Sequence, residues 1–229
     1  MVTERGDEPR SVEFFLDPMC PWAYQASLWI REVRQATGLE IAWRFFSLEE
    51  INRPDDRPHP WERPWAWGWS QMRVGAYLRR DGQDLADRWY AAVGEAFFER
   101  AVPTQHREVQ AEVLDGAGLD PAAVEAAVAD PTTNDEVLAD HEAAVAIGGF
   151  GVPILMFPDG ANLFGPSVAP APRGEEAVRL WGLVLAWREF PNLHEMQRPK
   201  SPADWERIAD LFAPYLEARD WQTIQNPAP

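Results

Sequence analysis

The chain has a single cysteine, Cys20, among its 229 residues. One cysteine excludes a disulfide within the chain, which agrees with a reducing compartment. Basic residues are also scarce, because 21 Lys and Arg stand against 37 Asp and Glu, and the formal net charge is −16. Without a basic surplus to neutralise phosphate groups, nucleic acid and anionic membranes are not expected partners.

Long apolar runs are missing as well. The first ten residues are charged, contain no signal core and are expected to be frayed, and the longest uncharged run, residues 143–158, is broken by glycine and proline. A membrane span needs about 18 or more uninterrupted apolar residues, and a secretory signal needs an apolar core. We therefore expect a cytoplasmic protein without a membrane span, as a monomer or a homodimer.

Patterns that hold metals and nucleotides are absent from the sequence. The four histidines are scattered without the H-x-x-x-H spacing of zinc ligands, so we predict no metal site. The glycines at 148–151 follow a predicted helix rather than a strand, so they do not fit a dinucleotide-binding loop. We predict no flavin or nucleotide site.

What the chain does have is ample material for a core, including 12 Trp and 11 Phe. The apolar run 11–16 predicts a buried strand, and apolar spacing predicts a helix over 21–37 that Gly38 ends. Residues 40–46 alternate and are rich in aromatic and β-branched side chains, which predicts a second strand. A strand, a helix and a strand in this order predict a parallel pair.

After this unit the pattern becomes helical for about eighty residues. The predicted helices span 70–80, 84–100, 105–116, 121–129 and 134–147. A strand at 151–157, an Asp-Gly hairpin turn, a returning strand at 161–164 and a helix over 173–190 follow. A linker and an amphipathic helix over 202–217, bent near Pro214, end the chain and are expected to pack on the body or to form a subunit contact.

Cys20 lies between the first strand and the first helix. Pro21 suits the first helical position, where its missing N–H costs nothing. Free N–H groups and the positive end of the helix dipole gather there, and such a position favours the reactive thiolate. The alternative is a lone cysteine that is simply buried as a small hydrophobe.

The strand followed by Cys20-Pro21-Trp22-Ala23 resembles the Cys-x-x-Cys motif of the thioredoxin superfamily, with Ala23 in place of the second cysteine. The flanking residues 14–22 and 47–52, together with Gly-Val-Pro at 151–153, Phe-Gly-Pro at 164–166 and the run 172–176, resemble the DsbA-like branch. Within it the chain is most similar to actinobacterial proteins that include a mycothiol-dependent nitroreductase. The resemblance covers about residues 12–192 and implies an α/β fold, a thioredoxin fold with an inserted all-helical domain.

The pattern of strands and helices, together with the resemblance, predicts the domain boundaries. Residues 11–50 and 149–192 are expected to form the thioredoxin-like domain and 51–148 the inserted loop and helical domain. Residues 193–229, beyond the resemblance, are expected to form a C-terminal helical extension. The resemblance further implies that Pro153 is a cis-proline that faces Cys20, so that the Val152 backbone is an edge on which an extended thiol ligand pairs.

Ala23 removes the resolving cysteine, so a dithiol cycle within one chain is not available. The expected function is a thiol-disulfide oxidoreductase or thiol-dependent reductase with one nucleophile, Cys20, and mycothiol or a similar low-molecular-weight thiol as cofactor. One alternative is a glutathione-transferase-kappa-like or isomerase-like enzyme in which the thiol belongs to the cofactor. Another is a redox-inactive binding protein. A small-molecule or disulfide substrate is the expected second partner.

Three further residues are candidates for substrate or thiol binding. Asn52 matches an asparagine that the family places by its site, although a loop cap explains it equally well. Arg173 suits a carboxylate of the thiol, but a surface arginine at a helix start is the simpler interpretation. Trp65 belongs to a tryptophan-rich stretch, 61–69, that either packs on the helical region or forms an aromatic wall over Cys20. Trp22 either stacks on a ligand or shields the helix start.

Overall fold

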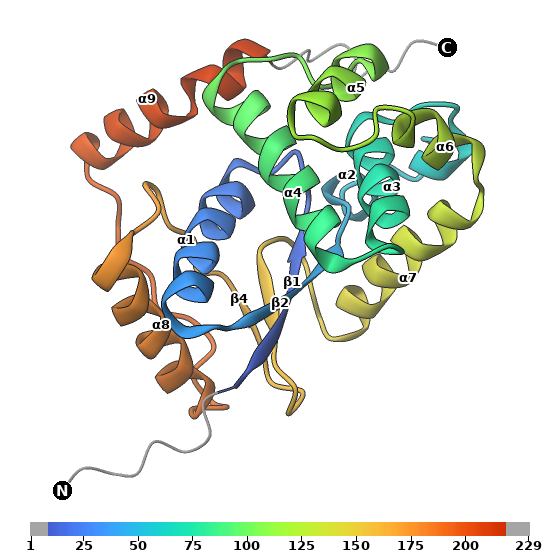
Figure 1. Ribbon diagram of the computed structural model, residues 1–229. Coiled ribbons are helices and arrows are strands. Elements are labelled where there is room, and N and C mark those ends of the chain that lie inside the picture. The colour runs from blue at the N-terminus through green and yellow to red at the C-terminus, as the bar shows by residue number, and fades with distance from the viewer. Residues whose placement is uncertain (1–8, 219–229) are drawn as a thin grey trace, which may run out of the picture.

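The computed structural model describes residues 9–218 as a four-stranded mixed sheet with helices around it (Figure 1). The strands are β1 (Ser11–Leu16), β2 (Glu40–Phe45), β3 (Ile154–Met156) and β4 (Asn162–Phe164). Their order in the sheet is β2-β1-β3-β4. β1 is parallel to β2, as predicted, and antiparallel to β3, which in turn is antiparallel to β4.

Helices make up most of the rest of the described chain. They are α1 (Pro21–Thr37), α2 (Leu48–Ile51), α3 (Trp67–Arg79), α4 (Gln83–Gly94), α5 (Arg107–Gly116), α6 (Ala123–Ala129), α7 (Thr132–Ala146), α8 (Gly174–Arg188) and α9 (Pro202–Ala218), with a 3₁₀ turn η1 (Pro60–Glu62) and a π-helical segment η2 (Glu95–Glu99). Figure 1 shows α1 beside α8, with α3 to α7 as one group at the centre and right.

Local signals set the ends of α1. Pro21 begins the helix, and Gly38 ends it with a φ of 77°, a left-handed conformation that glycine adopts at little cost. The inner face of α1 buries Trp29, whose Nε1 donates to the carbonyl oxygen of Ala177 in α8. α1 is therefore fixed against α8, and its first turn follows the carboxyl end of β1.

The inserted helices are tied together by a buried cation. Arg73 in α3 is 6% exposed and donates to Thr133 Oγ1 and to the carbonyl oxygens of Ala127, Val128 and Asp130. These bonds join α3 to the α6–α7 turn, which explains how a buried guanidinium is tolerated. The predicted domain boundaries stay a prediction, although α3 to α7 do interrupt the strand order between β2 and β3.

The predicted last helix is present as α9, with Pro214 inside it. It packs against η2 rather than against the sheet. The part of the predicted C-terminal extension beyond residue 218 lies outside the described residues, as do the first eight residues of the predicted frayed segment. Within residues 9–218, no helix is long and apolar enough to cross a membrane.

Candidate active site

Cys20 is the N-cap residue of α1, directly after the β1–α1 turn. Its backbone N–H donates to the carbonyl oxygen of Asp17, which closes that turn. The thiol itself donates to the carbonyl oxygen of Val152, with Sγ and O 4.0 Å apart. The Val152–Pro153 peptide bond is cis. The chain therefore brings the Cys-Pro-Trp-Ala turn and the Val152–Pro153 segment face to face across 132 residues of sequence.

The ionisation of Cys20 differs from the sequence-based expectation. Burial raises the pKa of the Cys20 thiol to about 11, and the Asp17 carboxylate adds to the increase. The N–H groups of Ala23 and Trp22 lower the pKa, as a helix start should. That effect is present but is outweighed, because only 7% of Cys20 is exposed and a thiolate there loses most of its hydration. The prediction that this position favours the thiolate is therefore wrong for this structure, in which burial dominates.

Asp17 is a site residue that the sequence motifs did not single out. It is 1% exposed, and burial raises the pKa of its carboxyl group to about 6. Its two oxygens accept hydrogen bonds from the backbone N–H groups of Met19 and Leu48. Asp17 therefore fastens the start of α2 to the turn that carries Cys20. An aspartate before proline at a strand end was the available signal.

Trp22 and Ala23 follow Cys20 in the first turn of α1. Ala23 is fully buried, so the position of the missing second cysteine is filled by core packing. Trp22 is half-buried, and its ring meets Phe212 of α9 edge-on with centroids 5.3 Å apart. This contact corresponds to the shielding interpretation of Trp22, and its partner comes from the C-terminal helix.

The three candidate binding residues lie apart from one another. Asn52 is the C-cap of α2, and its Nδ2 donates to the carbonyl oxygen of Leu48. Trp65 donates from Nε1 to the carbonyl oxygen of Gln105 and lies under the guanidinium of Arg107, so its contacts are with the inserted helical part. Arg173 is the N-cap residue of α8 and lies across α1, against Glu32.

Two further tryptophans of the 61–69 stretch pack inward. Trp69 is 1% exposed and donates from Nε1 to Asn134 Oδ1. Trp67 is 3% exposed and meets Phe97 edge-on. For these two side chains the packing interpretation is confirmed, because their rings are enclosed by the helical part.

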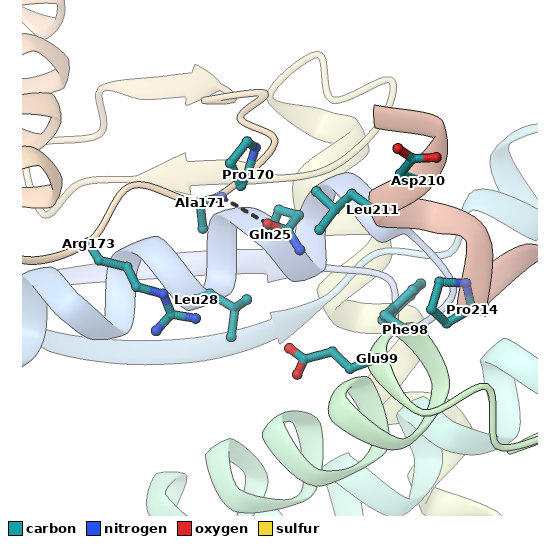
Figure 2. A pocket seen from close by; sticks show the side chains of 10 residues that line it. All are labelled: Gln25, Leu28, Phe98, Glu99, Pro170, Ala171, Arg173, Asp210, Leu211 and Pro214. Atoms are coloured by element: carbon teal, nitrogen blue, oxygen red, sulfur yellow. Dashed lines mark hydrogen bonds between the residues drawn. The ribbon is translucent and has the colours of Figure 1, made fainter. Parts of the chain in front are cut away.

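A pocket of about 390 Å³ begins one helical turn after Trp22 (Figure 2). Its lining comes from α1, η2, the loop before α8, and α9: Gln25, Leu28, Phe98, Glu99, Pro170, Ala171, Arg173, Asp210, Leu211 and Pro214. In Figure 2 the Arg173 guanidinium and the Glu99 carboxylate point toward the same space beside Leu28. The pocket thus offers one cation, carboxylates and an apolar wall.

Two groups in this region are held firmly. Glu99 in η2 accepts a 2.6 Å hydrogen bond from the Tyr24 hydroxyl, and burial followed by this carboxylate raises the pKa of Tyr24. Gln25 is buried, and its Oε1 accepts from the backbone N–H of Ala171. The walls are therefore positioned by neighbouring residues and do not depend on a ligand. Within residues 9–218, no cluster of three or more His, Cys, Asp or Glu is arranged to hold a metal ion.

Residues 19–198 match the family model of the Rv2466c-like proteins, described as mycothiol-dependent nitroreductase Rv2466c. The chain belongs to this family. A Mycobacterium tuberculosis relative named uncharacterized protein Rv2286c is 50% identical over 216 residues, which is 94% of each chain.

Solved structures show the same fold at low sequence identity. A 2-hydroxychromene-2-carboxylate isomerase is 18% identical with a TM-score of 0.57, and the match covers 78% of this chain and 95% of that one. A probable DsbA oxidoreductase from Streptomyces coelicolor is 21% identical with a TM-score of 0.55, covering 84% and 96%. The cytosolic disulfide reductase DsbM from Pseudomonas aeruginosa is 15% identical with a TM-score of 0.54, covering 77% and 99%. The fold of this Rv2466c-like protein is therefore a DsbA-like thioredoxin fold with a helical insertion, as predicted.

Proposed function

We propose that this protein is a thiol-dependent oxidoreductase in which Cys20 is the single nucleophile and mycothiol, or a similar small thiol, is the co-substrate. The observation that carries the proposal is the juxtaposition of the Cys20 thiol, at the start of α1, with the carbonyl oxygen of Val152 beside Pro153. Membership of the mycothiol-dependent family supports the choice of thiol.

The chemistry balances as a monothiol cycle on a mixed disulfide. The substrate is a mixed disulfide that contains the small thiol. The Cys20 thiolate attacks the sulfur of the small thiol in that disulfide and forms a new S–S bond with it. The old S–S bond breaks, and the other half of the substrate leaves as its thiolate and takes a proton. A second molecule of the small thiol then attacks the sulfur of that thiol on Cys20. This step releases the symmetrical disulfide of the small thiol and restores the Cys20 thiolate. Each turnover therefore consumes one free molecule of the small thiol and converts the mixed disulfide into the substrate thiol and that symmetrical disulfide.

The residues near Cys20 fit a small polar thiol. An extended ligand at Cys20 meets the backbone of Val152, and the pocket after Trp22 presents Arg173, Gln25 and Glu99 beside apolar side chains. We propose that Arg173 binds an anionic or strongly polar group of the thiol. Asn52 and Trp65 stay candidates for ligand contact, and their present hydrogen bonds support capping and packing roles.

A second function is favoured by one observation, the raised pKa of Cys20. A cysteine that stays protonated at neutral pH is suited to donate a hydrogen bond to a thiolate that belongs to a bound co-substrate. In that case the enzyme resembles a glutathione-transferase-kappa-like or isomerase-like protein, and Cys20 is never oxidised. The Sγ–H group would then orient the reacting sulfur rather than attack it.

Two substitutions separate these functions. Cys20→Ala and Cys20→Ser are assayed for mycothiol-dependent reduction of a mixed disulfide and of a nitroaromatic compound, with Ala213→Ser on the exposed side of α9 as the matched control. The nucleophile proposal predicts that both Cys20 variants lose activity while Ala213→Ser retains it. If Cys20→Ser keeps most of the activity, the hydrogen-bond function is correct and the nucleophile proposal is wrong.

The binding residues are tested by their Michaelis constants. Arg173→Ala is expected to raise the KM for the thiol by about tenfold or more, because a charge-assisted contact contributes about 1.5–3 kcal/mol. Arg179→Ala, an exposed arginine two turns along α8, is the matched control and should leave the KM unchanged. Asn52→Ala and Trp65→Phe test the two remaining candidates, and an unchanged KM assigns them structural roles.

A further inference from the structure

The start of α1 is covered by a segment that is remote in sequence. Phe212 of α9 meets the ring of Trp22 edge-on, and Trp22 lies two residues after Cys20. Lys200, the only lysine in the chain, places its ammonium group 5.7 Å from the Trp22 ring centre and 5.2 Å from that of Trp205. Cation–π and edge-to-face contacts therefore fix both the linker before α9 and α9 itself over Trp22.

The other end of α9 is fastened beside η2. The Tyr215 ring lies 5.3 Å from the ring of Phe97 and 5.6 Å from that of Phe98, both measured between centroids. Gln105 Nε2 donates to the carbonyl oxygen of Ala218 over 3.5 Å. α9, at the upper left of Figure 1, therefore contacts both the first turn of α1 and η2.

The rest of α9 buries few side chains. Ile208 and Ala218 are the buried residues among its described side chains, whereas Trp205 is 55% and Leu216 52% exposed. A segment with few buried apolar contacts has a low free energy of local opening. Pro214 also removes one bond from the hydrogen-bond ladder of the helix. α9 is therefore expected to open locally at a low free-energy cost.

α9 also forms one wall of the pocket after Trp22, through Asp210, Leu211 and Pro214. Its residues 202–218 lie beyond the region 19–198 that matches the family model. The same helix thus both covers the first turn of α1 and encloses the adjoining pocket. A pocket of about 390 Å³ suits a small molecule and has no room for a folded protein chain.

We infer that α9 and the linker with Lys200 are a movable cover that restricts Cys20 to small ligands: it opens to admit a low-molecular-weight thiol or disulfide, and it excludes disulfides that belong to folded proteins. This inference deepens the proposed function, on which the identity of the ligand rests. The existence of the cover is inferred only from the contacts of Trp22, Lys200 and Phe212, and not from the proposed function. Opening also rehydrates Cys20, which is the change that makes thiolate formation easier.

The experiment measures the rate at which Cys20 is alkylated, so it needs neither mycothiol nor activity. Wild type, Phe212→Ala and the matched control Leu216→Ala are each treated with iodoacetamide and with a maleimide that carries a long polyethylene-glycol chain. Phe212→Ala is expected to react about tenfold faster than wild type with iodoacetamide, with a larger gain for the bulky reagent, because each tenfold change corresponds to about 1.4 kcal/mol of opening free energy. Leu216→Ala should match wild type.

Two outcomes overturn the inference. One is that Phe212→Ala reacts at the wild-type rate with both reagents. The other is that wild type is alkylated by the bulky maleimide as readily, relative to its denatured form, as by iodoacetamide. If Phe212→Ala does not fold, as judged by circular dichroism, Lys200→Ala gives the same reading, since it removes the cation between Trp22 and Trp205 and leaves both rings. The two ideas fail separately. If the cover exists but the proposed function is wrong, Phe212→Ala is alkylated faster than wild type although wild type has no thiol-dependent activity.

Discussion

The ionisation of Cys20 gives a quantitative prediction. Burial raises its pKa to about 11 from an ordinary value of 9.0. At pH 8 an ordinary thiol with that value is about one-tenth thiolate, whereas Cys20 in the closed fold is about one-thousandth thiolate. Alkylation of the folded protein should therefore be about a hundredfold slower than that of the denatured chain, before any slowing by restricted access is added.

The assay is the pH dependence of the iodoacetamide rate, followed by intact mass, for folded and denatured protein. The denatured chain should show its inflection near 8.5–9, and the folded protein should show a rate that still rises above pH 10. Since the folded pKa is above the unfolded one, the free energy of unfolding should fall as the pH rises from about 9 to about 11. A folded inflection at or below 8.5 refutes the reasoning, because it means that the helix-start N–H groups outweigh burial.

The part played by Asp17 is tested in the same assay. Its charge raises the pKa of Cys20, so Asp17→Asn should move the inflection of the folded protein to lower pH. Asp115→Asn makes the same change of charge at an exposed position on α5 and should leave the inflection in place. An unchanged inflection in Asp17→Asn would show that the carboxylate does not act on the thiol.

Two further predictions concern the fold around the site. Gly94→Ala puts a Cβ atom 2.4 Å from the buried Tyr24 ring and should lower the free energy of unfolding by roughly 2 kcal/mol, whereas Gly182→Ala in α8, where a Cβ meets nothing within 4 Å, should be neutral or stabilising in the same urea titration. Arg73→Met removes hydrogen bonds to four acceptors and should cost about 3 kcal/mol in thermal or urea unfolding, while Arg179→Met on the exposed face of α8 should change stability by less than about 0.5 kcal/mol.

Local chemistry made the main elements predictable. Pro21 and Gly38 mark the two ends of α1, and the strands and inserted helices were found within a few residues of their predicted ends. The short helix α2 was missed, although Ser47 is followed three residues later by Glu50 and does cap it by accepting from the Glu50 N–H. A four-residue helix leaves too little periodicity to be recognised in a proline-rich region.

The chemistry of the site was less predictable, because it depends on contacts between distant segments. Cys20 and Pro153 could be found through motifs, but the pKa of Cys20 follows from burial that no local pattern reveals. Phe212 and Lys200 lie about 190 and 180 residues from Trp22, outside the motifs that carry the resemblance. The hydrogen bond from the Leu48 N–H to Asp17 likewise joins the β1–α1 turn to the start of α2. These two segments lie close together only because β1 and β2 pair in the sheet.

The central claim, that Cys20 is a reactive monothiol, is tested most directly by intact mass. The purified protein is exposed to mycothiol disulfide and, separately, to glutathione disulfide, and each product is then treated with the matching free thiol. We predict one small-thiol adduct on Cys20 from mycothiol disulfide, removed by mycothiol. No adduct with either disulfide, while the denatured chain does react, would contradict the claim and favour a protein that binds its ligand without oxidation of Cys20.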